Sequence, residues 1–171
     1  MAKDNSIFPR HLIADLKIIE QLRGSFTFID KDNIYWTESY IDEETGNKWL
    51  YYRVDTYLQG GGYPIFALQP LPDTKRLIQL SLLSENDDEV FAACRTLVDN
   101  ELTKKIDFRS DLIHELEHID DNQRRQRIVE LTTLDSASNR REILGKTLEE
   151  INLDANYYRS IAARAAKLKG Q

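Results

Sequence analysis

Two histidines and a glutamate in the segment IHELEHID, residues 113–120, have the spacing H-E-x-x-H. Residues four apart on a helix lie on one face, so the imidazoles of His114 and His118 could bind one zinc ion while Glu115 polarises a bound water. The motif therefore predicts, as one alternative, a zinc-dependent hydrolase in which both histidines are metal ligands and Glu115 is the general base.

The helix that must carry this motif favours a different interpretation. With about 100° of rotation per residue, its apolar stripe is centred near Leu112 and Leu116, and both histidines point away from that stripe. Groups that act on a substrate usually converge in a concave pocket and do not face open solvent. We therefore expect an ordinary solvated helix face with only adventitious affinity for transition-metal ions, and no catalytic residue, no dedicated metal site and no cofactor.

A third zinc ligand is also missing from its usual place. The extended pattern H-E-x-x-H-x-x-G-x-x-H needs glycine at position 121 and histidine at position 124, but the chain has Asp121 and Arg124 there. A glutamate from a following helix is the remaining alternative, for which Glu130 and Glu142 are the candidates. The zinc hydrolase is therefore the second of two functional hypotheses.

The charge of the chain indicates what kind of partner it could bind. The 171 residues carry a net charge of −6: residues 1–72 contain 7 basic and 10 acidic side chains, and residues 73–171 contain 16 and 19. Nucleic acids and anionic membranes attract proteins rich in lysine and arginine, so neither is expected as a partner. We expect another protein with a basic surface, and the sequence leaves the oligomeric state open.

The first residues of the chain and the lengths of its apolar stretches indicate a cellular location, and the neighbours of its single cysteine indicate burial. The opening residues MAKDN lack the apolar run of a signal peptide, and no stretch reaches the ~20 apolar residues of a membrane helix. These features predict a cytoplasmic protein. Cys94 lies among Val90, Leu97 and Val98 at helical spacing, so we expect a buried, unreactive thiol.

Within the first 72 residues, the spacing of apolar residues changes from that of a helix to that of strands. Apolar residues between Leu12 and Leu22 recur about every 3.6 positions after Pro9, which predicts a helix from Pro9 to Leu22 that stops at Gly24. The following segments SFTFI, IYWTESYI, KWLYYRVDTYL and YPIFALQPL are rich in aromatic and β-branched residues and are separated by turn-forming residues. They predict a four-stranded antiparallel meander between residues 25 and 71.

From Asp73 onward the apolar period is again that of a helix. We expect six helices, joined by short turns into three antiparallel hairpins, at about 73–84, 86–99, 108–120, 122–134, 138–151 and 153–168. The segment NDDEVFAACRTLV resembles the second helix of HEAT-type repeats, which leaves two arrangements open. The hairpins could form a short HEAT-like array or a compact bundle packed on the sheet.

Aromatic residues of the predicted strands are the best candidates for a binding surface. Adjacent strand positions point to opposite faces of a sheet, so pairs such as Tyr35-Trp36 and Tyr51-Tyr52 place large rings on both faces. If one face is exposed, its aromatic and arginine side chains would suit protein recognition. The candidate binding residues are Tyr35, Trp36, Trp49, Tyr51, Tyr52 and Arg53.

The sequence as a whole predicts an α+β fold without an active site. Residues 1–72 would form a helix and an antiparallel meander, and residues 73–171 a helical region packed on the sheet as one globular unit. The leading hypothesis is a non-catalytic cytoplasmic protein-binding module, of the adaptor kind or of the kind of the immunity proteins that neutralise toxins. The second part of that hypothesis is an analogy of size and charge.

Overall fold

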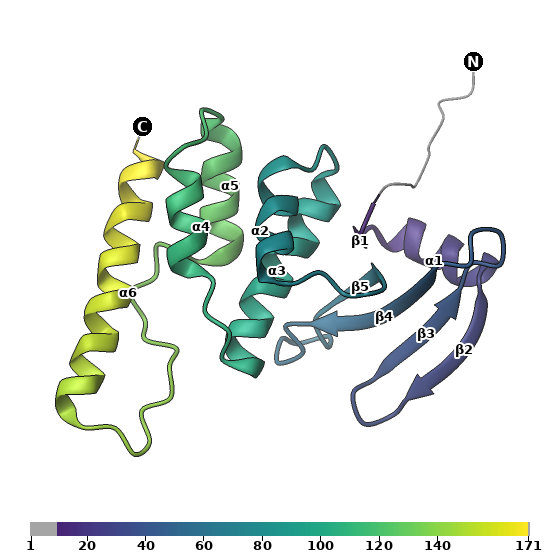
Figure 1. The fold of residues 1–171 in the computed structure, drawn as a ribbon, viewed down its shortest axis with the longest axis horizontal. Coiled ribbons are helices and arrows are strands. Elements are labelled where there is room, and N and C mark those ends of the chain that lie inside the picture. The colour runs from purple at the N-terminus through teal and green to yellow at the C-terminus, as the bar shows by residue number, and fades with distance from the viewer. Residues whose placement is uncertain (1–9, 171) are drawn as a thin grey trace. The chain divides into compact units, whose positions relative to one another are not determined.

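The computed structural model describes residues 10–170, which form a five-stranded antiparallel sheet and six α-helices (Figure 1). The chain divides into two compact units, Met1–Ala93 and Cys94–Gln171. All five strands belong to the first unit. Within the described residues, no helix combines the length and the apolar character needed to cross a membrane. The α+β class predicted from the sequence is confirmed.

The sheet contains the predicted meander and one strand more. The meander consists of β2 (Thr27–Asp32), β3 (Thr37–Ile41), β4 (Lys48–Val54) and β5 (Tyr63–Leu68), each antiparallel to its neighbour. The short strand β1 (Leu12–Ile13) pairs with the outer edge of β5, so the order is β1-β5-β4-β3-β2. The prediction of four strands is therefore wrong, because it omits β1.

Carboxylates from far along the chain explain why residues 12–13 form a strand. Oε1 of Glu89 accepts from the amides of His11 (2.7 Å) and Leu12 (3.0 Å), while Oδ2 of Asp88 accepts from the amides of Ala14 and Asp15. These acceptors and β5 satisfy amides that a helix would have bonded internally. The predicted helix is correspondingly shorter, and its expected start at Pro9 lies outside the described residues.

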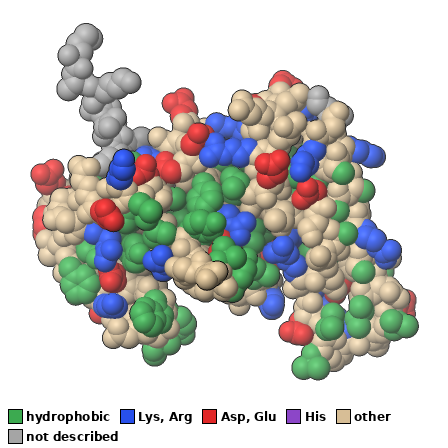
Figure 2. All heavy atoms as spheres, turned by 180° about the vertical axis from the view of Figure 1, so that it is seen from behind, with side chains coloured by type: hydrophobic (Ala, Val, Ile, Leu, Met, Phe, Trp, Pro, Cys, Tyr) green, Lys and Arg blue, Asp and Glu red, His purple; other side chains and the backbone are tan. Residues whose placement is uncertain are grey.

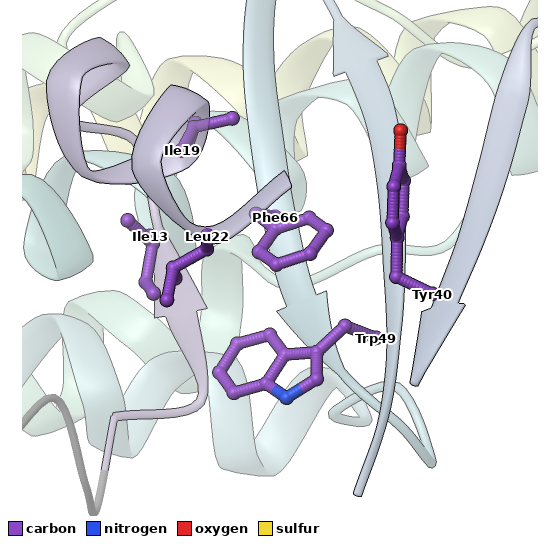
Figure 3. Close-up of a cluster of buried hydrophobic side chains, with 6 residues drawn as sticks. All are labelled: Ile13, Ile19, Leu22, Tyr40, Trp49 and Phe66. Atoms are coloured by element: carbon purple, nitrogen blue, oxygen red, sulfur yellow. The ribbon is translucent and has the colours of Figure 1, made fainter. Parts of the chain in front are cut away.

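The helix α1 (Leu16–Ser25) is capped by Asp15, whose carboxylate accepts from the amides of Lys17 and Ile18. The helix runs through Gly24 instead of stopping there. The apolar face of α1 covers one face of the sheet (Figure 3). Trp49 stacks on Phe66 with 5.2 Å between ring centroids. The buried cluster consists of Ile13, Ile19, Leu22, Tyr40, Trp49 and Phe66.

Five helices follow the sheet, whereas the apolar pattern predicted six. They are α2 (Thr74–Leu83), α3 (Asp87–Lys104), α4 (Arg109–Leu116), α5 (Asn122–Thr132) and α6 (Leu148–Lys169). The predicted helix at 138–151 is wrong, because residues 133–147 contain no helix and α6 begins only at 148. The third of the three predicted hairpins therefore lacks its first helix.

A capping box sets the true start of α6. The Thr147 hydroxyl accepts from the amide of Glu150, and the Glu150 carboxylate accepts from the amide of Thr147 (2.8 Å). This reciprocal pair satisfies two amides that would otherwise lack partners in the first turn. Gly145, with φ of +78°, lies just before it in a conformation that interrupts a helix.

A buried ion pair connects the elements of the second unit. The guanidinium of Arg109, fully buried, donates from Nε to Oε1 of Glu101 (2.6 Å) and from Nη2 to Oε2 (2.9 Å). Its Nη1 donates to the carbonyl of Thr133, the residue that caps α5, and the Tyr158 hydroxyl of α6 donates to Glu101 (3.3 Å). The pair thus joins the end of α3, the start of α4, the end of α5 and α6.

Candidate functional site

The turn between β2 and β3 exposes three consecutive large apolar side chains. The exposed fractions of Ile34, Tyr35 and Trp36 are 81%, 75% and 72%. Oδ1 of Asp32 accepts from the amides of Ile34 (2.7 Å) and Tyr35 (3.2 Å), which holds the turn in one conformation. Since the backbone of the turn is held by its own hydrogen bonds, a partner could bind these side chains without first having to order that backbone.

The backbone of Trp36 is in an unfavourable conformation. Its φ is +55°, the left-handed region that residues other than glycine, asparagine and aspartate rarely adopt. The cost of this conformation is about 1–2 kcal/mol. Such strain is concentrated at functional sites, where the surrounding structure maintains it. Asp55, Lys105 and Thr133 also have a positive φ, but Trp36 is the aromatic residue among these four.

The loop between β4 and β5 lies at the same end of the sheet as this turn. Both β2 and β4 run towards that end, since each is antiparallel to β3, and the β3–β4 turn is at the opposite end (Figure 1). The loop exposes Tyr57 (66%) and Leu58 (38%). Figure 2, which shows the molecule from behind, places apolar side chains in the region of the β2–β3 turn. We call this surface the aromatic end; it consists of Ile34, Tyr35, Trp36, Tyr57 and Leu58.

Arg53 and three glycines shape the β4–β5 loop. Arg53 donates from Nε to the carbonyl of Gly61 (2.8 Å) and from Nη2 to that of Gly62 (3.3 Å). Gly62 has φ of +75°, and a Cβ there would lie 2.0 Å from the carbonyl oxygen of Val54. The loop therefore needs glycine at 62 for space as well as for conformation. β4 ends at Val54 because Asp55 also has a positive φ.

The six predicted binding residues have different surroundings. Only Tyr35 and Trp36 are fully on the surface, whereas Trp49 is buried beneath α1. Tyr51 is half-buried with the guanidinium of Arg23 4.4 Å from its ring centroid. Tyr52 and Arg53 are half-buried as well, and Arg53 supports the loop. The structure thus brings two of the six into the aromatic end and adds neighbours to them.

Tyr57 and Leu58 were missed by sequence reasoning. The string KWLYYRVDTYL continues its alternation past Val54, so both residues were included in a strand. The local signal that could have separated them is the run of turn-forming residues around them, with Asp55 before and Gln59-Gly60-Gly61-Gly62 after. An aromatic residue inside such a loop is more exposed than one in a strand.

The H-E-x-x-H segment lies at the end of α4 and faces solvent. His114 is in the last turn of the helix, which ends at Leu116, and His118 follows in a turn. Both imidazoles are exposed, the orientation expected from the helical wheel, and their ring centroids are 4.7 Å apart. Among residues 10–170, no three side chains of histidine, cysteine, aspartate or glutamate converge as a metal-binding group.

Glu117, between the two histidines, is held by Arg164 of α6. The guanidinium donates from Nε to Oε1 (2.8 Å) and from Nη2 to Oε2 (2.7 Å). This hydrogen-bonded ion pair, with a smaller contribution from both imidazoles, lowers the pKa of Glu117. The carboxylate is therefore ionised at neutral pH and already engaged with α6.

A second exposed apolar surface lies in the turn before α6. Arg141 and Lys146 both pair with Asp154, which anchors the turn on each side. The amide of Lys146 donates to the carbonyl of Ile143 (3.2 Å), and Gly145 supplies the positive φ. The turn and the adjoining helix expose Ile143, Leu144, Leu148 and Leu153. Ile143, Leu144 and Leu148 lie within the predicted helix at 138–151, but in the structure they are exposed, as is Leu153.

The predicted burial of the Cys94 thiol is confirmed. The thiol is fully buried in α3, and burial raises its pKa to about 12. At neutral pH the thiolate that reacts with disulfides or metals is therefore almost absent.

Comparisons of the chain with family models, with curated proteins and with solved structures found no match.

Proposed function

We propose that this chain is a non-catalytic protein-binding module whose contact surface is the aromatic end of the sheet. The single observation that supports this most is the turn at Ile34, Tyr35 and Trp36, which is exposed, internally hydrogen-bonded and strained at Trp36. Monomeric soluble proteins rarely gather large apolar side chains at the surface unless these contact something. Tyrosine and tryptophan are also enriched among the residues that dominate binding energies.

The rings of the aromatic end could supply about half of the area of a stable contact. An aromatic side chain contributes about 150–250 Å² when buried. Because Tyr35, Trp36 and Tyr57 are 75%, 72% and 66% exposed, together they could contribute about 300–500 Å². A typical stable interface buries about 800 Å² on each partner. Ile34, Leu58 and the polar residues around them would supply the remainder.

The partner expected is a protein with an apolar pocket and a basic rim. Asp30 and Asp32 are exposed on β2, beside the turn, and the whole chain has a net charge of −6. Lys31 is the basic residue of this strand, and it pairs with Glu38 of β3 (3.6 Å). Carboxylates at the rim of an apolar contact favour a positively charged partner and raise the rate of association.

Photochemical cross-linking tests the location of this surface. Incorporation of p-benzoylphenylalanine at Tyr35 should give one dominant adduct with a partner in native lysate after irradiation. The matched control is the same substitution at Leu83, which is 74% exposed on α2 and belongs to the same unit. No adduct at Tyr35, or the same adduct with equal yield from both positions, would contradict the proposal.

The strain at Trp36 provides a test that separates binding from folding. Asparagine tolerates the left-handed region better than tryptophan, so Trp36→Asn should leave the melting temperature unchanged or raise it slightly. The same substitution removes a large exposed ring and should weaken binding of the cross-linked partner about 30-fold, the effect of a hot spot worth 2 kcal/mol. A variant that binds as well as the wild type would refute the role of Trp36.

A further inference from the structure

The two imidazoles of the H-E-x-x-H segment suggest a property that does not depend on the proposed function. His114 and His118 are both exposed; His114 lies in α4, and His118 lies in the turn that follows the last residue of the helix. The amide of Glu117 donates to the carbonyl of Ile113 (3.2 Å) and that of His118 to the carbonyl of Glu115 (3.0 Å). The segment is therefore ordered up to His118, and the two rings are held close together.

A hydrogen bond fixes which nitrogen of His118 can bind a metal ion. Nδ1 of His118 lies 2.7 Å from the carbonyl oxygen of His114. A carbonyl oxygen only accepts hydrogen bonds, so in the neutral ring Nδ1 carries the proton and Nε2 has the free lone pair. Metal-binding histidines commonly donate their second nitrogen to a carbonyl in this way, which orients the ring.

The separation of the rings fits shared coordination of one ion. With a metal–nitrogen distance of about 2.0–2.1 Å, and roughly 1.1 Å from the nitrogen to the ring centre, two imidazoles at about 90–110° lie about 4.5–5.2 Å apart. The observed distance between the His114 and His118 ring centroids is 4.7 Å. The two rings meet edge to face, with an interplanar angle of 60°, so their side chains must rotate to bring one nitrogen of each onto a common ion.

The charges around the pair favour a cation. The acidic residues Asp111 and Glu115 are both exposed on the same short helix as His114. The carboxylate of Glu117 is paired with the guanidinium of Arg164, whose positive charge offsets its own, so Glu117 is counted neither as a ligand nor as a source of negative charge. Since residues 10–170 supply no group of three ligands, water must complete the coordination.

We infer that His114 and His118 form a two-imidazole binding site for a divalent transition-metal ion, open to solvent on its remaining sides. Imidazole ligands suit Zn²⁺, Ni²⁺ and Cu²⁺, and the general order of affinity places Cu²⁺ above the other two. A site with two protein ligands binds reversibly and exchanges its ion with chelators. It differs in this respect from a site with three or four protein ligands, which retains its metal during purification.

The experiment uses the full chain without an affinity tag, titrated with Cu²⁺ and with Zn²⁺ by calorimetry. The expected result is about one ion per chain with tighter binding of Cu²⁺, and affinity reduced at least tenfold by His114→Ala or His118→Ala, since loss of even an outer-shell partner costs that much. The matched control is His11→Ala, because Nε2 of His11 already lies 2.9 Å from a guanidinium nitrogen of Arg76.

A spectroscopic measurement locates the ion. Paramagnetic Cu²⁺ should broaden the amide NMR signals of residues 111–121 first, and the unchanged circular dichroism of both alanine variants should show that the fold is retained. Absence of binding, or binding that both single substitutions leave unchanged while His11→Ala weakens it, would overturn the inference. The aromatic end would be unaffected by that result, because its test involves other residues.

Discussion

The buried ion pair between Glu101 and Arg109 allows the most direct test of how the second unit is held together. The substitution Glu101→Gln preserves the shape of the side chain and removes its charge. The side chains of Arg109 and Glu101 are 0% and 4% exposed, so the guanidinium would remain buried without a compensating anion. The Tyr158 hydroxyl would still find an amide oxygen as acceptor.

The expected cost follows from this burial. Removing one partner of a buried ion pair destabilises a protein by about 3–5 kcal/mol, because the remaining charge stays desolvated. The Glu117–Arg164 pair provides a matched control with the same two-bond geometry but with side chains that are 33% and 34% exposed. For an exposed pair the cost is about 0–1 kcal/mol, so Glu117→Gln should have little effect on the free energy of unfolding.

Urea denaturation followed by circular dichroism at 222 nm measures both variants. With a slope of about 2 kcal/mol per molar urea, Glu101→Gln should lower the midpoint of the transition that includes the second unit by roughly 1.5–2.5 M. The double variant Glu101→Leu with Arg109→Met removes both charges and should cost less than Glu101→Gln alone. If Glu101→Gln costs no more than Glu117→Gln, burial does not control the strength of the pair and the reasoning fails.

Three further predictions concern single positions. Gly62→Ala places a methyl group against the backbone and should lower the free energy of unfolding by at least about 2–3 kcal/mol more than Gly60→Ala, which has a positive φ but open space around it; equal melting temperatures would contradict this. The Cys94 thiol, whose pKa is raised to about 12 by burial, stays protonated at pH 8 and should react with a disulfide reagent only after denaturation; rapid reaction of the native protein would contradict this. Thr147→Ala removes the cap of α6 and should cost about 1 kcal/mol in thermal unfolding, whereas Thr147→Ser should cost less; equal costs for the two would show that the hydroxyl is not the cap.

The strands of the meander could be predicted because their signals are local. Alternating aromatic and β-branched residues, separated by turn-forming residues, identified β2 to β5. The extra strand β1 could not be predicted in this way, since it depends on β5 and on the carboxylates of Asp88 and Glu89, more than 70 residues away. The apolar spacing of Leu12 and Ile13 fits a helix equally well, and long-range hydrogen bonds decided between the two.

The error at residues 138–151 has a different cause. Ile143, Leu144 and Leu148 have the spacing of a buried helix face, but they are exposed, and the anchors of this turn are the charged residues Arg141 and Lys146. Periodicity cannot distinguish an apolar face that is buried from one that is not. Local signals for the true boundary were present in Gly145 and in the threonine and glutamate of the capping box.

The candidate site was predictable in part. The sequence identifies the aromatic-rich strands as the region of interest, and Tyr35 and Trp36 belong to the aromatic end. It could not separate them from Trp49, because burial of an aromatic residue depends on which face α1 covers. The outward orientation of His114 did follow from the helical wheel, since that argument needs only the position of the apolar stripe, whereas His118 lies in the turn after α4.

The two tryptophans of the chain have opposite environments, one in a solvent-exposed turn and the other in the core beneath α1. Their emission should therefore differ in colour, with Trp36 at longer wavelength and open to quenching by iodide, and Trp49 at shorter wavelength and shielded. The protein thus contains an intrinsic pair of optical reporters. One spectrum can distinguish a ligand covering the tip of the sheet, which shifts the red component, from melting of the core, which shifts the blue one.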